Sequence, residues 1–115
     1  MQELELVRGE GRTRVILNAR EMGNGVVLFI YNENAHIGAI ALGEYDAATK
    51  RVSTSVITRL GHKDDAIAQR AAYLVSKSTH RPSCVIAGVH LDDIIESEID
   101  EILGNAESLI SELTT

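Results

Sequence analysis

The chain has 115 residues, close to the commonest size of one domain, so we expect a single domain over residues 1–115. Apolar residues make up 44% and charged residues 24%, which excludes a disordered or fibrous protein. Aromatic residues make up only 3% and the net charge is −6, so neither base stacking nor attraction to phosphate backbones favours a nucleic-acid partner.

The first half of the chain is predicted to form strands joined by short turns, because apolar and polar residues alternate or form short apolar runs. Five strands are expected, over residues 4–8, 12–20, 26–31, 36–42 and 52–60. The run 26–31 is apolar throughout, which is typical of a central strand. The fourth strand carries the small residues Gly38, Ala39 and Ala41, which allow a helix or another chain to approach closely.

The second half changes to a helical period. Residues 64–77 predict a helix, 84–89 a short strand, and apolar residues between 99 and 113 a helix face of about four turns. This last helix is expected to begin near Ser97, which pairs with Asp100 as a cap, and to bend or split at Gly104.

The order βββββαβα predicts an α+β domain with a mainly antiparallel sheet of about six strands and two helices on one face. The five strands joined by short turns favour an antiparallel meander. The strands on either side of the first helix should run parallel if they share the sheet, so that their carboxyl ends lie at the same edge.

Charge is unevenly distributed along the chain. Residues 91–115 contain eight acidic residues and no Lys or Arg. Arg8, Arg12, Arg14 and Arg20 form a basic cluster across the first hairpin, which is interpreted either as a solvated face or as a contact for the acidic last helix or an acidic partner.

The cysteine content and the hydropathy of the sequence predict the cellular compartment of the protein. Cys84 is the only cysteine and lies in an apolar run, so we expect it to be a buried small side chain. The first residues show no signal-peptide pattern, and no apolar run approaches the ~20 residues of a membrane span. A cytoplasmic protein without a membrane partner is therefore expected.

Two similar segments are the best candidates for a binding site. Gly61-His62-Lys63-Asp64-Asp65 follows one predicted strand, and Gly88-Val89-His90-Leu91-Asp92-Asp93 follows another. Because the two strand ends should share one sheet edge, His62 and His90 are expected on the same side of the molecule. A helix beginning at Asp64 offers unpaired N–H groups and partial positive charge, which suit a phosphate or carboxylate.

The same segments also allow two other interpretations. Asp64 and Asp65 are typical of a helix start, and Gly61 and Gly88 of chain turns, so the pattern also fits a purely structural role. Alternatively, His62 and His90 with one nearby carboxylate could bind a metal, although no metal-binding motif is complete. The position of His36 relative to these residues could not be predicted.

Three segments in order resemble a known family: His36-Ile37-Gly38-Ala39-Ile40-Ala41, Gly61 to Asp65, and Ala87-Gly88-Val89-His90-Leu91-Asp92, followed by an acidic helix. They resemble the small LpdD-like accessory proteins of UbiD/UbiX-type hydroxyarylate decarboxylase systems. The resemblance implies a fold related to proteasome-assembly-chaperone domains, often paired as homodimers. It also implies a chaperone for prenylated FMN, with a UbiX-type prenyltransferase and a UbiD-type decarboxylase as partners.

If the resemblance holds, the chain is a non-catalytic accessory protein that binds or delivers prenylated FMN. Carried onto this sequence, the cofactor-binding residues are Gly61, His62, Lys63, Asp64, Gly88 and His90. One alternative is a homodimeric interaction or assembly module with no small-molecule site. A second alternative is a small metal-assisted enzyme that uses His62 and His90.

Overall fold

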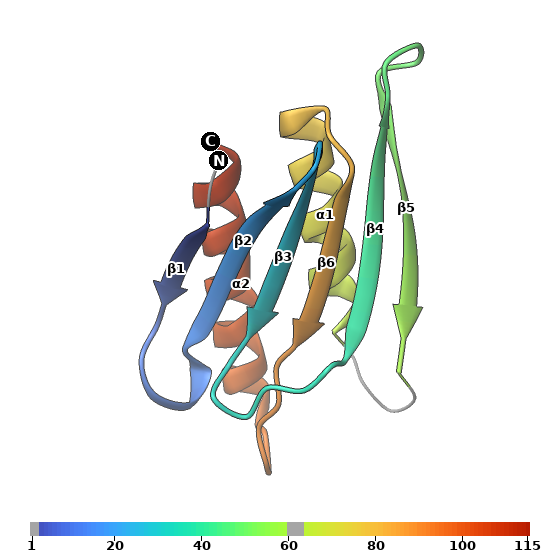
Figure 1. Cartoon of the computed structure of the whole chain (residues 1–115). Coiled ribbons are helices and arrows are strands. Elements are labelled where there is room, and N and C mark those ends of the chain that lie inside the picture. Colours follow the sequence, from blue (N-terminus) through green and yellow to red (C-terminus); the bar gives the residue numbers. More distant parts are fainter. Residues whose placement is uncertain (1–2, 60–63) are drawn as a thin grey trace.

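A computed structural model of the chain describes residues 3–59 and 64–115, which form a six-stranded sheet with both helices on one face (Figure 1). The elements in chain order are β1 Leu4–Arg8, the 3-10 turn η1 Gly11–Thr13, β2 Val15–Met22, β3 Gly25–Tyr31, β4 Ala39–Asp46, β5 Arg51–Thr58, α1 Asp65–Thr79, β6 Ser83–Gly88 and α2 Glu96–Thr114. The predicted order of elements, the α+β class and the placement of both helices are confirmed.

The sheet order is β1-β2-β3-β6-β4-β5. Strand β6 lies between β3 and β4, parallel to β3 and antiparallel to β4. The expected uninterrupted meander is therefore wrong, because the last strand separates β3 from β4. Strands β5 and β6 do run in the same direction, as predicted, with β4 between them. Their carboxyl ends lie at one edge of the sheet, the lower edge in Figure 1.

Alternation along the strands builds the core. Val15 and Leu17 of β2 and Leu28 and Ile30 of β3 are fully buried on the helix side. Ala39 and Ala41 of β4 are buried on the same side, where α1 packs. The small-residue stripe predicted for this strand is therefore occupied by a helix of the same chain.

Helix α2 is continuous from Glu96 to Thr114 and passes through Gly104 without a break, so the predicted bend or split does not occur. Asn105 is turned toward the sheet, and its side-chain Nδ2 donates to the carbonyl of Thr13 at 2.9 Å. The helix begins at Glu96, close to the predicted Ser97, but its cap differs from the prediction. Glu98, and not the Ser97–Asp100 pair, closes the first turn by accepting from the backbone N–H of Ile95 at 3.2 Å.

Two members of the basic cluster hold the acidic helix against the sheet. Arg8 pairs with Glu112 near the end of α2. Arg12 donates to Glu98 at 2.8 Å and to the carbonyl of Asp92 at 2.8 Å. These contacts confirm the interpretation in which the cluster meets the last helix. Hydrogen bonds from Arg12 and from the Ile95 N–H hold the pKa of the Glu98 carboxyl below its usual value.

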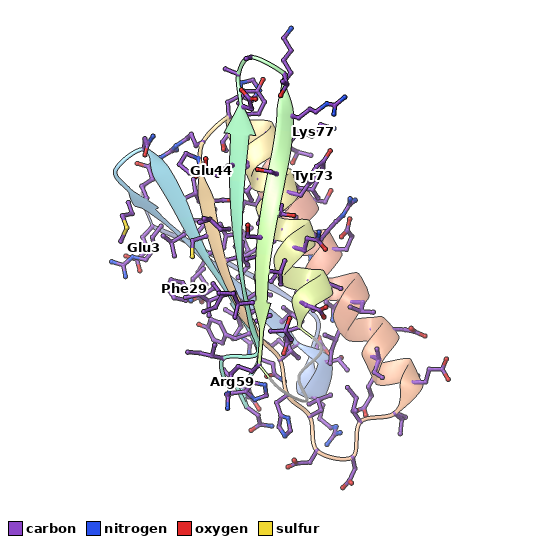
Figure 2. All side chains as sticks on the ribbon, turned by 90° about the vertical axis from the view of Figure 1, so that its right-hand side faces the viewer. Glu3, Phe29, Glu44, Arg59, Tyr73 and Lys77 are labelled. Atoms are coloured by element: carbon purple, nitrogen blue, oxygen red, sulfur yellow. The ribbon has the colours of Figure 1, made fainter. Side chains whose placement is uncertain are left out.

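The other face of the sheet has no helix in the described part of the chain, and we call it the open face (Figure 2). Phe29 points to this side in Figure 2, away from both helices. Register places these side chains on the open face: Val7, Ile16, Val27, Phe29, Ile40, Leu42, Ile57 and Ile86. Cys84 also lies here and is half-buried, so the expectation of a fully buried thiol is wrong.

The packing of α1 on β4 predicts the effect of a methyl group at Gly43. A Cβ there would lie 2.6 Å from the carbonyl oxygen of Ala72 and 2.7 Å from the hydroxyl of Ser76. We expect Gly43→Ala to lower the free energy of unfolding by about 1–3 kcal/mol, measured by urea denaturation. Gly104→Ala is the control, because nothing lies within 4 Å of its Cβ position. We expect that variant to be about 0.5–1 kcal/mol more stable, and equal effects at the two positions would contradict this packing.

The contact of Arg12 with Glu98 predicts an acid-sensitive component of stability. Because the folded-state pKa of Glu98 is lowered, its contribution is present above the unfolded value of about 4.5 and is lost as pH falls through the folded value. We expect Glu98→Gln to lower the Tm at pH 7 and to reduce the fall in Tm below pH 4.5. Thermal unfolding of both proteins across this range tests it, with Glu101→Gln as control. Parallel curves for the original protein and Glu98→Gln would contradict the assignment.

Candidate functional site

A polar cluster lies at the sheet edge where β3 and β6 end and β4 begins. The rings of His36 and His90 are 5.2 Å apart between centroids and tilted by 55°. Nε2 of His36 is 3.9 Å from Oδ2 of Asp64, and Asp64 is buried with 6% of its surface exposed. Three segments far apart in sequence therefore converge: the β3–β4 loop, the residue before α1, and the segment after β6.

Two side chains fix the backbone after β6. Buried Asn32 accepts from the backbone N–H of His90 at 3.1 Å and donates to its carbonyl at 2.8 Å. Asp64 accepts from the N–H of Val89 through Oδ1 at 3.0 Å. The carboxylate is thus held by backbone and makes no side-chain cap on α1. The position of His90 is consequently set by hydrogen bonds from two other segments.

Two glycines allow this convergence. A Cβ at Gly88 would lie 1.3 Å from the carbonyl oxygen of His36, so the two backbones touch where a side chain cannot fit. A Cβ at Gly38 would lie 1.9 Å from Oδ2 of Asp64. The Gly38 N–H also donates to the Ala87 carbonyl at 2.9 Å. The close contact between β6 and the β3–β4 loop therefore requires a glycine at position 88.

The structure brings together three of the six residues assigned to the site from the sequence. Asp64, Gly88 and His90 lie at one edge, as the crossover argument predicted. Gly61, His62 and Lys63 lie outside the described residues. His36 and Asn32 complete the cluster and were not assigned to it. The insertion of β6 beside β3 places them there, and the pattern of the sequence gave no sign of that pairing.

Two cavities meet at His36. The inner cavity, on the helix side, has a volume of about 240 Å³ and is lined by Asp64, His90 and apolar residues that include Leu91, Ile99 and Ile102. The second lies on the open face and has a volume of about 420 Å³. Its lining includes Asn18, Phe29, Tyr31, His36, Ile37 and Ile86, and we call it the aromatic hollow.

The aromatic hollow has an apolar floor and polar margins. Phe29 and Tyr31 are two of the four aromatic residues of the chain. Asn18 donates to the Tyr31 hydroxyl at 2.7 Å, which fixes both side chains. Arg59 lies nearby and donates to the carbonyl of Ile37 at 2.9 Å, with its side chain exposed (Figure 2). A flat apolar ligand with a polar edge and an anionic end matches this chemistry.

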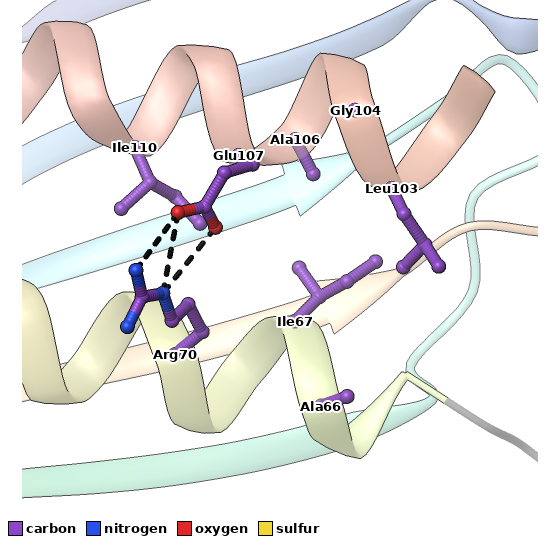
Figure 3. Close-up of a pocket in the computed structure, with 8 residues that line it drawn as sticks. All are labelled: Ala66, Ile67, Arg70, Leu103, Gly104, Ala106, Glu107 and Ile110. Carbon is purple, nitrogen blue, oxygen red and sulfur yellow. Dashed lines mark hydrogen bonds and ion pairs between the residues drawn. The ribbon is translucent and has the colours of Figure 1, made fainter. Parts of the chain in front are cut away.

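A third cavity of about 450 Å³ runs between α1 and α2 (Figure 3). Ile67, Leu103 and Ile110 line it, and Arg70 crosses it to Glu107 with a shortest contact of 3.0 Å. Hydrogen bonding to Glu107 raises the pKa of the Arg70 guanidinium above its usual value. Both side chains are about half exposed, so the pair adds little stability. We interpret this groove as the space left between the side chains of α1 and α2 where the two helices pack together.

The described residues contain no cluster of side chains that would support the metal-binding interpretation. Among residues 3–59 and 64–115, no group of three or more His, Cys, Asp or Glu side chains is arranged to hold a metal ion. His90 makes a 3.0 Å contact with Asp92. His62, the other proposed ligand, lies outside the described part. The described helices also include none that is both long and apolar enough to cross a membrane.

The fold has a known counterpart among solved structures. It is similar to a chain of the structure titled "Crystal Structure of a Novel Chaperone Complex for Yeast 20S Proteasome Assembly", with a TM-score of 0.62 and 17% sequence identity. The likeness covers 98% of this chain and 96% of that chain. The domain therefore has the proteasome-assembly-chaperone fold that was expected.

Sequence comparison gives the family. Residues 9–115 match the prenylated flavin chaperone LpdD-like domain, so the chain belongs to that family. The resemblance stated from the three sequence segments is confirmed. No curated protein matches the chain.

The buried carboxylate of Asp64 predicts a test of how the site is held together. We expect Asp64→Ala to lower the free energy of unfolding by about 1–3 kcal/mol, because it leaves the Val89 N–H without its charged acceptor. Amide hydrogen exchange at Val89 and His90 should accelerate. Asp65→Ala, at an exposed neighbouring position, is the control. Unchanged exchange at Val89 in Asp64→Ala would contradict this role.

Proposed function

We propose that this protein is a non-catalytic chaperone that holds prenylated FMN and delivers it to a UbiD-type aromatic acid decarboxylase. The observation that carries the proposal is the aromatic hollow beside His36, in a chain that belongs to the prenylated flavin chaperone LpdD-like family. A UbiX-type prenyltransferase would be the source of the cofactor.

The hollow fits the ring end of the cofactor. The prenylated isoalloxazine is flat and largely apolar, and Phe29, Tyr31 and Ile86 offer it an apolar surface. Asn18 and His36 also line the hollow and would supply hydrogen-bonding groups to the polar edge of the ring. Phe29 and Tyr31 would supply an aromatic surface for stacking on the ring. Part of the ring would remain open to solvent, which suits a carrier that must release its cargo.

The phosphate end requires positive charge. Exposed Arg59 lies beside Ile37 at the margin of the hollow. His62 and Lys63 follow Arg59 within four residues of sequence, and with Gly61 they remain in the proposed site. Exposed His90 adds a further donor. Asp64 and Gly88 take part by positioning His90 and His36, since a buried carboxylate would repel a phosphate.

Flavin retention tests the function and the site together. We expect the protein co-expressed with a UbiX-type prenyltransferase to be purified with about one prenylated FMN per chain, measured by absorbance and by mass. His36→Ala and the triple variant His62→Ala/Lys63→Ala/His90→Ala should each raise the Kd for the flavin about tenfold, which corresponds to the loss of about 1.4 kcal/mol of binding, and should be purified with less flavin per chain.

The matched control is His80→Ala. His80 lies at the end of α1 and stacks on Tyr45 with 4.0 Å between ring centroids. That variant should retain the flavin. A colourless original protein would contradict the carrier function. Full retention by the triple variant, with loss in His36→Ala, would restrict the site to the aromatic hollow.

A second function, a homodimeric interaction or assembly module, is favoured by a different observation. The open face carries large apolar side chains that no described helix covers. Such a module would bind the decarboxylase subunit with the flavin absent. A flavin-free protein that still binds the decarboxylase in a pull-down would support it over the carrier function.

A further inference from the structure

Three apolar side chains near the start of α2 are exposed and also line the inner cavity. Ile94 and Ile99 are each 41% exposed, and Leu103 is 45% exposed. All three belong to the wall of the cavity that contains His36 and His90. The wall on the α2 side is therefore open to solvent. Exposed apolar side chains gathered at a cavity are typical of an interaction site.

Two exposed carboxylates flank these apolar residues. Residues three or four positions apart are neighbours on the surface of a helix. Glu96 therefore lies beside Ile99 and Asp100, and Asp100 also lies beside Leu103. We call the set Ile94, Glu96, Ile99, Asp100 and Leu103 the α2 patch. It combines apolar and acidic side chains on one side of the helix.

The two carboxylates of the α2 patch differ from other acidic residues of the helix. Three glutamates pair with arginines of the same chain: Glu98 with Arg12, Glu107 with Arg70, and Glu112 with Arg8. In the described part of the chain, Glu96 and Asp100 form no ion pair. The helix dipole favours Glu96 in the first turn, but Asp100 lies beyond that turn. The negative charge of Asp100 is therefore available to a basic partner.

The size of the inner cavity limits what can enter it. Its volume of about 240 Å³ is below the roughly 300–1,000 Å³ of typical pockets for cofactors and other small molecules. Its wall is mainly apolar, with His36, Asp64 and His90 as the polar members. One apolar side chain of a partner protein fits this size and chemistry better than a flavin does. Protein interfaces commonly depend on such an anchor seated in a pocket.

We propose that the α2 patch is the docking surface for the protein that receives the cofactor, which binds it through a basic segment that carries apolar side chains. This inference rests on the proposed function, which supplies the identity of the partner as a UbiD-type decarboxylase. The carboxylates of Glu96 and Asp100 lie one helical turn apart, about 6 Å along the axis, so the segment presents two Lys or Arg side chains at that spacing. An apolar side chain beside them enters the inner cavity.

The position of the α2 patch favours the recipient as its partner. His36 lines both the inner cavity and the aromatic hollow, so a protein seated on the patch is separated from the proposed flavin site by this side chain. A recipient bound there is placed to accept the cofactor as it leaves the hollow. The patch belongs to the helix side of the sheet, so docking does not compete with a partner on the open face (Figure 1).

The first test compares two adjacent carboxylates of α2. Asp100 belongs to the patch, whereas exposed Glu101 is turned about 100° around the helix axis from it, away from Leu103. The protein is purified from co-expression with the prenyltransferase, and biolayer interferometry measures its binding to a flavin-free UbiD-type decarboxylase. Asp100→Lys should raise the Kd at least about tenfold, and Glu101→Lys, with the same change in net charge, less than about threefold. Equal effects, or no binding by the original protein, would overturn the inference.

The second test compares two leucines of nearly equal exposure. Leu103 of the α2 patch is 45% exposed, and Leu42 on the open face is 47% exposed. Leu103→Gln should raise the Kd for the decarboxylase at least about fivefold, and Leu42→Gln less than about twofold. Thermal unfolding checks that both variants are folded. A loss of affinity in Leu42→Gln that equals or exceeds the loss in Leu103→Gln would contradict docking on the α2 patch.

Docking and flavin retention are measured on the same sample, so their failures are distinguishable. Absorbance gives the flavin per chain, and Asp100→Lys should retain as much flavin as the original protein. A protein that docks through the α2 patch but holds no flavin would keep this surface and contradict the carrier function. A flavin-loaded protein whose Asp100→Lys variant binds the decarboxylase as well as the original does would keep the carrier function and overturn the docking surface.

Discussion

The close contact between Gly88 and the backbone of His36 is the constraint on which the site depends. Strand β6 is inserted between β3 and β4, so the loop that joins those strands must cross the end of β6. It does so with no room for a side chain at Gly88. The crossing places His36 between the inner cavity and the aromatic hollow. Asn32, from the same loop, then fixes His90 through its backbone.

The two faces of the sheet differ in their packing. Helices α1 and α2 bury the side that carries Leu17 and Leu28, and this packing accounts for the stability of the domain. Arg8 and Arg12, on the first hairpin and its turn, are the basic partners of two acidic residues of α2, Glu112 and Glu98. No described helix covers the open face. Its aromatic hollow and its apolar surface are continuous through Phe29 and Ile86.

Much of the fold could be predicted from the sequence because its signals are local. Alternation identified the strands, and helical spacing identified α1 and α2 within a few residues. The position of β6 could not be predicted, because pairing between distant strands leaves no local pattern. As with the fold, only part of the candidate site could be predicted from the sequence. The shared edge of Asp64, Gly88 and His90 followed from the crossover, whereas His36 and Asn32 required the sheet order. The break expected at Gly104 was overridden by the contact of Asn105 with Thr13.

The sheet order also has a consequence for how the chain acquires its structure during synthesis. The ribosome makes β1 to β5 before β6, yet β6 is the strand that joins β3 to β4. Until it emerges, the three-stranded unit β1-β2-β3 and the hairpin β4-β5 expose unpaired inner edges, and those edges are open to wrong pairing with other chains. Helix α2 is made later still and covers β1 and β2. Folding of this domain therefore waits until α2 has emerged and is governed by contacts distant in sequence.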